Sequence, residues 1–116
     1  MFLDAIKNEI TPLVKCFIGY PDTGSKPAYA VIRSTTSYSV NDISGDILAL
    51  QSTLHIYCVT KGFTASQKMA SDIANLLSGK HFNGKALILN SIDYQGIVEG
   101  NHETVVSLTY EGGKPE

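Results

Sequence analysis

Positive charge is scarce in this sequence, and the few basic residues do not cluster. The 116 residues include one arginine, Arg33, and eight lysines, and the formal net charge is −2 at pH 7. Proteins that bind DNA or RNA usually present a basic patch to the phosphate backbone. Because no more than two basic residues lie close together in the sequence, the composition argues against direct recognition of nucleic acid.

Cysteines are also few, and no segment has the length of a membrane span. The two cysteines, Cys16 and Cys58, are too few for a disulfide framework, which favours a reducing intracellular compartment. No run approaches the roughly 18 apolar residues that a transmembrane helix needs. Asp4, Lys7 and Glu9 interrupt the apolar residues near the N-terminus, so we expect neither a signal peptide nor a membrane partner.

No residues are spaced like the ligands of a metal ion. The three histidines, His55, His81 and His102, do not have metal-ligand spacing, and the sequence contains no Cys-x-x-Cys motif. A zinc site would have to bring Cys16 and Cys58 together with two of these histidines from distant parts of the chain. We therefore expect no metal and no cofactor.

Nucleophilic catalysis by a cysteine is the enzymatic alternative that the sequence leaves open. Cys16 follows Lys15, whose charge would favour a thiolate, whereas Cys58 lies in an alternating pattern that turns it toward a core. The serines form no Gly-x-Ser-x-Gly motif. A structural role for both thiols is the better interpretation, and we expect no enzymatic activity.

Two other patterns resemble ligand-binding loops but lack a required feature. Residues 79–86 match the phosphate-binding pattern Gly-x-x-x-x-Gly-Lys, yet Ala86 stands where Ser or Thr would hold magnesium. This segment is also expected to follow a helix and open a strand, the reverse of a phosphate loop. Asp22, Asp42 and Asp46 could bind calcium weakly, but the late glutamate of an EF-hand loop is absent. A helix end with an Asn-Gly turn, and solvated loop acids, explain these residues.

Hydrophobic periodicity predicts two helices. The first is amphipathic and covers residues 2–14, with Pro12 either bending its last turn or ending it near Ile10. The second begins at a capping box, Thr64–Gln67, in which each side chain satisfies a free backbone N–H of the other residue. Gly79 is expected to end this helix.

Alternating apolar residues predict four strands and one long connection. The expected strands cover residues 28–34, 47–60, 85–95 and 103–111. Residues 34–46 are rich in hydroxyl groups and form either a long loop or the tip of a long β-hairpin. Residues 112–116 are expected to fray. The simplest arrangement is one α+β domain over residues 1–116, with a four-stranded, mainly antiparallel sheet, two helices packed on one face, and the order α-β-β-α-β-β.

The layout and several short strings resemble the small tail-completion or tail-terminator proteins of long-tailed bacteriophages. The strings are an N-terminal amphipathic helix, a Pro-aromatic-Val strand opening, a long strand of the Leu-x-Ile-x-Cys kind and a helix of the Ala-x-x-Ile-x-x-Leu kind. They correspond here to residues 2–14, Pro27–Val31, Leu54–Cys58 and Ala70–Leu76. The resemblance covers nearly the whole chain, although no single motif in it is specific.

This resemblance implies a structural role in a phage or prophage virion. Such proteins form a six-membered ring that caps the tail tube, stops its growth and joins tail to head. The implied partners are further copies of the chain, the tail tube protein and a head-closure or neck protein, with assembly in the host cytoplasm. The family has no active site and no fixed functional motif, so no residue role is transferred from it.

The long loop supplies the candidate contact residues. Tyr38, Val40 and Ile43 are aromatic or aliphatic residues in a polar segment, and such residues are favoured at contacts with a partner when they are exposed. Asp42 lies among them, so the candidate interface consists of these four residues. Packing of the same side chains onto their own domain is equally compatible with the sequence. Another phage neck component, such as a head-closure or connector protein, is the alternative function, and a small Cys-dependent enzyme is a more distant one.

Overall fold

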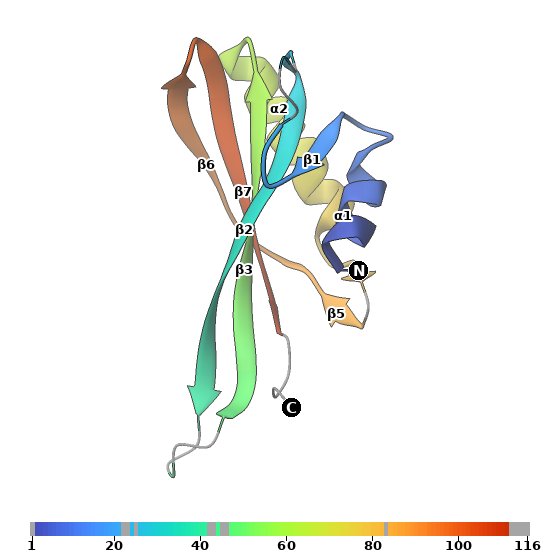
Figure 1. Ribbon diagram of the computed structural model, residues 1–116, viewed down its shortest axis with the longest axis vertical. Helices are drawn as coiled ribbons and strands as arrows, with labels where there is room; N and C mark the ends of the chain where they lie inside the picture. Colours follow the sequence, from blue (N-terminus) through green and yellow to red (C-terminus); the bar gives the residue numbers. More distant parts are fainter. Residues whose placement is uncertain are drawn as a thin grey trace.

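The computed structural model describes residues 2–21, 24, 26–41, 44, 47–82 and 84–111, and at residues 2, 34–41, 47–51 and 111 it describes the backbone alone. Two helices and seven strands lie in this part of the chain (Figure 1). They are α1 (Phe2–Ile10), β1 (Cys16–Ile18), β2 (Tyr29–Asn41), β3 (Ile47–Thr60), α2 (Phe63–Leu77), β4 (His81–Phe82), β5 (Lys85–Ala86), β6 (Ile88–Val98) and β7 (Asn101–Glu111).

Five of the strands form one mixed sheet, in the order β1-β2-β3-β7-β6. β1 runs parallel to β2, and the other neighbouring pairs are antiparallel. β4 and β5 pair separately as a two-stranded sheet. The expected four-stranded, mainly antiparallel sheet and the order α-β-β-α-β-β are therefore wrong.

The additional strand of the main sheet is β1, which the sequence does not reveal. It has only three residues, too few for an alternating pattern to be recognised. Its place is fixed by hydrogen bonds to β2 and by bonds just beyond its ends. The Ala30 N–H donates to the Lys15 carbonyl, and the Gly19 N–H donates to the Ile32 carbonyl, each at 2.8 Å. Contacts with a distant segment, rather than local periodicity, thus create this strand.

β2 and β3 form a long hairpin that takes up much of the expected loop over residues 34–46. Their pairing continues as far as Asn41 opposite Ile47, as the hairpin alternative requires. The segment contains Thr, Tyr and Val, whose branched or aromatic side chains suit a strand. β7 accompanies β3 only as far as Gln51, so the end of the hairpin forms a two-stranded arm that extends from the body (Figure 1).

The start of α2 differs from the expected one. Gly62 is the N-cap residue, and no side chain makes a capping hydrogen bond there, so the expected capping box at Thr64–Gln67 is wrong. Both of these residues lie within the helix. The buried Ser66 hydroxyl instead meets the buried Thr104 hydroxyl of β7 at 2.9 Å. This polar contact anchors the first turn of α2 to the sheet.

The ends of both helices agree with the sequence analysis. α1 ends at Ile10, two residues before Pro12. α2 ends at Leu77, and Gly79 follows its C-cap with φ +80°, a backbone conformation that glycine adopts without strain. Residues 79–86 therefore follow a helix and include strands β4 and β5. A phosphate loop instead follows a strand and opens a helix. Neither helix in the described part of the chain has the length and apolar character needed to cross a membrane.

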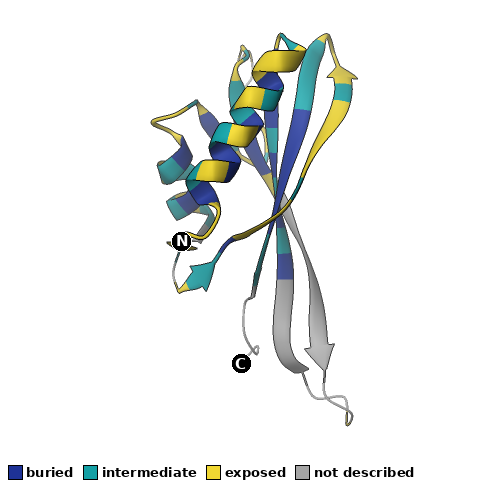
Figure 2. Cartoon of the chain, turned by 180° about the vertical axis from the view of Figure 1, so that it is seen from behind, coloured by how far each residue is buried: buried dark blue, intermediate teal, exposed yellow. Residues whose placement is uncertain are grey.

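Both helices cover the same face of the sheet and enclose the core (Figure 2). Cys58 is fully buried there, as its alternating pattern predicts. The buried core residues are Ile6 and Ile10 of α1, Ala70, Ile73, Ala74 and Leu77 of α2, Leu87, and, from the sheet, Cys16, Ala30, Ile32, Leu54, Ile56, Cys58, Val106 and Leu108. Neither of the two described helices lies against the opposite face of the sheet (Figures 1 and 2).

Candidate interaction surfaces

Two of the four candidate contact residues lie in the arm. Tyr38 and Val40 lie in β2, where both pair with residues of β3. Asp42 and Ile43 lie outside the described residues. A two-stranded hairpin is only marginally stable by itself in water, so an arm of this kind gains from a partner that covers it. The contact role of these four residues remains a prediction.

β6 forms one edge of the main sheet and carries much of the exposed apolar surface. Six of the ten large apolar side chains that the described residues expose belong to this strand, which makes it the strongest candidate interface. Their exposed fractions are 62% for Ile88, 39% for Leu89, 36% for Ile92, 38% for Tyr94, 64% for Ile97 and 48% for Val98. Exposed apolar patches are uncommon on monomers and often mark protein interfaces. An open sheet edge adds unpaired backbone groups to this surface.

The turn after β6 carries an acidic residue. β6 and β7 are joined by Glu99 and Gly100, which have φ +51° and +82°. Two positive φ values are typical of a type I′ turn, which matches the twist of an antiparallel hairpin. The connection is shorter than the segment between the expected strands. Glu99 is exposed at this tip, and Asp93 is exposed within β6.

Three rings fix β6 to the start of α2. Phe63 meets the Tyr94 ring edge-on, with 4.7 Å between centroids, and Tyr94 stacks on His102 of β7. The Tyr94 hydroxyl also lies 2.7 Å from Nδ1 of His102. Edge-to-face and stacked aromatic contacts of this kind add to the stabilisation from burial. The edge strand is thus held in place by side chains despite having a neighbour on one side only.

The opposite edge of the sheet also exposes apolar groups, next to basic ones. Ile18 of β1 is 38% exposed and Tyr20 is 79% exposed. The Arg33 guanidinium lies 5.9 Å from the Tyr20 ring centroid and 5.2 Å from that of Tyr57, in the range of cation–π contacts. Lys15, which precedes β1, is exposed. This edge therefore combines an apolar surface with positive charge.

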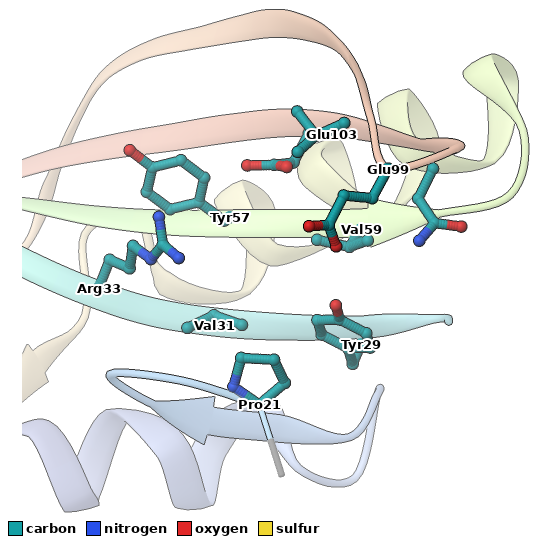
Figure 3. Close-up of a pocket in the computed structure, with 10 residues that line it drawn as sticks. Pro21, Tyr29, Val31, Arg33, Tyr57, Val59, Glu99 and Glu103 are labelled. Atoms are coloured by element: carbon teal, nitrogen blue, oxygen red, sulfur yellow. The ribbon is translucent and has the colours of Figure 1, made fainter. Parts of the chain in front are cut away.

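A shallow recess of about 210 Å³ lies on the helix-free face, between the two edges (Figure 3). Arg33 and Tyr57 line one part of it, and Glu99 and Glu103 line another. Val31 and Val59 contribute apolar surface beneath them, with Pro21, Tyr29, Val98 and Asn101 completing the lining. The recess therefore brings one cation and two carboxylates together over an apolar floor.

Burial suppresses the reactivity of both thiols. Cys58 is fully buried and Cys16 is 4% exposed. Burial raises the pKa of Cys58 to about 12, and the neighbouring Cys16 sulfur adds to this increase. Burial raises the pKa of Cys16 to about 11, although the charge of Lys7 opposes part of the shift. A thiol with such a pKa stays protonated near neutral pH and is a poor nucleophile.

We expect both thiols to resist alkylation in the folded protein at pH 8. Treatment with iodoacetamide followed by mass spectrometry should leave Cys16 and Cys58 unmodified, whereas the same treatment in denaturing urea should modify both. At pH 10 most of each thiol should still be protonated, because both pKa values lie above this pH, so both should react more slowly than a small free thiol. A native thiol that reacted as fast as a small free thiol would contradict the structure and support the Cys-dependent enzyme.

The histidines do not gather with other metal-binding groups. Within the described residues, no three His, Cys, Asp or Glu side chains lie close enough to hold a metal ion. His55 lies 3.2 Å from the Ser107 hydroxyl, and His102 contacts Tyr94. Asp22, Asp42 and Asp46 lie outside the described residues.

Two solved structures share the fold of this chain. One is a chain in the virion of a native gene transfer agent particle, which is 13% identical and has a TM-score of 0.62. That match covers 92% of this chain and 84% of the other. The second is 18% identical with a TM-score of 0.54, and it covers 97% of this chain and 89% of the other. No family model and no curated protein match the sequence. At these identities the likeness concerns the fold, and it extends over nearly the whole chain.

Proposed function

We propose that this chain is a structural protein of a phage or prophage virion that caps the tail tube as a hexameric ring and joins tail to head. The observation that carries the proposal is the fold shared with a chain of a gene transfer agent virion over 92% of this sequence. The partners are further copies of the chain, the tail tube protein and a neck protein. The protein assembles in the host cytoplasm and resides in the virion.

The surfaces of the molecule support a role in assembly. Exposed apolar residues lie at both edges of the sheet, at Ile97 on one side and Tyr20 on the other. A subunit with two different contact surfaces associates head to tail, and such contacts close into a ring when the rotation between neighbours permits it. The arm of β2 and β3 offers a further surface for the tube or the neck.

Another phage neck component is the second candidate, because the shared fold favours a virion protein without distinguishing positions within the virion. The tail cap is placed first because the layout of the chain resembles that of tail-completion proteins. A small Cys-dependent enzyme is disfavoured, since burial raises the pKa of both Cys16 and Cys58 well above neutrality.

We expect the purified chain to form a hexamer at high protein concentration. Multi-angle light scattering should give the mass of six chains, and negative-stain images should show rings with a central hole. Dilution should dissociate the rings if tail binding supplies part of the assembly free energy. A stable dimer without rings would contradict the proposal and favour another neck component or a different binding protein.

A further inference from the structure

We infer that the ring forms by docking the β6 edge of one copy against the β1 edge of the next. The inference rests on the proposed ring and names the surfaces that build it. The acidic edge comprises Ile92, Asp93, Ile97 and Val98, with Glu99 in the turn that follows. The basic edge comprises Lys15, Ile18, Tyr20 and Arg33. A second copy of this chain is the partner because each edge has chemistry complementary to the other.

The two edges lie at the same level of the sheet. Strand register connects Ile92 of β6 through Val106, Ile56 and Ile32 to Ile18 of β1. The two positions therefore lie at opposite ends of one row of paired residues that crosses the sheet. A neighbouring copy can present its β1 to β6 without a large shift along the strands.

Strand direction also fits this contact. Following the pairings from β1 to β6, β1 and β2 run one way, β3 the opposite way, β7 the first way and β6 the opposite way. When all copies point in the same direction along the ring axis, β6 therefore meets the next β1 antiparallel. Antiparallel pairs are the commoner and slightly more stable class.

The lengths of the two edge strands are similar where they would meet. Register shifts interrupt β6 between Leu89 and Ser91 and between Tyr94 and Gly96. The regular stretch between them is Ser91–Tyr94, and its partner β1 has three residues, Cys16–Ile18. Irregularities of this kind discourage longer strand additions and thus non-specific aggregation. A short strand pair flanked by side-chain contacts is the arrangement that this edge permits.

Charge selects this pairing over one between identical edges. The charged residues of β6 and its turn are acidic, Asp93 and Glu99, whereas the described charged residues between α1 and β3 are basic, Lys15, Lys26 and Arg33. The acids of that second segment, Asp22, Asp42 and Asp46, lie outside the described residues. Joining two β6 edges would bring acidic groups together, and like charges across an interface disfavour a partner. Joining unlike edges pairs acids with bases around a shared apolar surface.

A complementation experiment with two single variants tests the inference. Ile97→Lys places a positive charge at the acidic edge, where it would face the basic edge of the neighbour. Tyr20→Glu places a negative charge at the basic edge. Both side chains are largely exposed, at 64% and 79%, so neither change should affect folding. Ser71→Lys and Ser71→Glu add the same charges to an exposed position of α2 and serve as controls.

Each edge variant alone should be a monomer by analytical ultracentrifugation, whereas both Ser71 controls should form the same rings as the unmodified chain. An equimolar mixture of the two edge variants should yield a heterodimer and no ring. The reason is that one intact β6 edge can meet one intact β1 edge, and the remaining two edges are both blocked. A double variant carrying both changes should stay monomeric. Circular dichroism and thermal unfolding would verify that each variant is folded.

Several results would overturn the inference. If Tyr20→Glu self-associates while Ile97→Lys does not, β6 pairs with itself. If both edge variants form normal rings, the ring is real but uses other surfaces, so the proposed function stands and the inference fails. If the unmodified chain stays monomeric at every concentration, these edges do not drive self-association. The virion role is then judged separately by the presence of the chain in purified particles.

Discussion

Replacement of Ile56 by alanine should lower the free energy of unfolding by about 2–5 kcal/mol, the usual cost of removing a large aliphatic side chain from a core. Ile56 is fully buried in β3, with Ile32 of β2 and Val106 of β7 beside it in the sheet. The cavity would open beneath the helices, where the surrounding strands are fixed by pairing on both sides. Urea unfolding followed by circular dichroism would measure the loss from the midpoint and slope.

The matched control is the same substitution at an exposed position. Ile97→Ala removes an identical group from the edge strand, where the side chain is 64% exposed, and surface changes usually alter stability by no more than about 0.5 kcal/mol. The comparison is made at low protein concentration, so that self-association does not contribute. Equal losses at the two positions would show that Ile56 is not part of a close-packed core.

Disruption of the gene for this chain should abolish complete virions in the host that produces them. If the ring caps the tail tube, its absence removes both the stop for tube growth and the surface that joins the head. Electron microscopy of lysates should show filled heads without tails and free tubes of variable, excessive length. Expression of the unmodified chain from a plasmid should restore complete particles, as should the Ser71→Lys variant.

The two edge variants can be used in the same experiment to test whether ring closure uses these edges. If ring closure uses the edges at Ile97 and Tyr20, neither variant should restore particles. Tails of normal length beside separate heads would instead favour another neck role, because a tube whose length is controlled already has its cap. Complete particles in the absence of the chain would exclude it as an essential structural component.

Elements with a long local pattern could be predicted from the sequence. The alternation from Leu54 to Cys58 predicts a strand with one buried face. In the structure, Leu54, Ile56 and Cys58 are all fully buried. The helical spacing in α1 and the glycine after α2 likewise correspond to the structure. These predictions succeed because a strand or helix that buries one face must repeat apolar residues with its own period.

Short strands and strand order could not be predicted in the same way. β1 has three residues and owes its place to bonds with β2, which follows it by more than ten residues. The hydroxyl-rich part of β2 has only a short apolar repeat, at Tyr38 and Val40, and its strand character comes from pairing with β3. The capping box failed because α2 begins at Phe63, before Thr64, and the first turn is held by a contact between Ser66 and Thr104 that no local motif can anticipate.

At the candidate interface, too, some features follow from the sequence and others only from the packing of the chain. The sequence by itself determined that residues 85–95 favour a strand, that positive charge is too sparse for a nucleic-acid surface, and that Cys58 points inward. The tertiary structure alone decided that β6 is an edge, so that its apolar residues are exposed instead of buried. The amino-acid pattern of an apolar strand is the same whether one or both of its sides are paired. Exposure depends on which distant segments lie beside it, and that is a property of the packed chain.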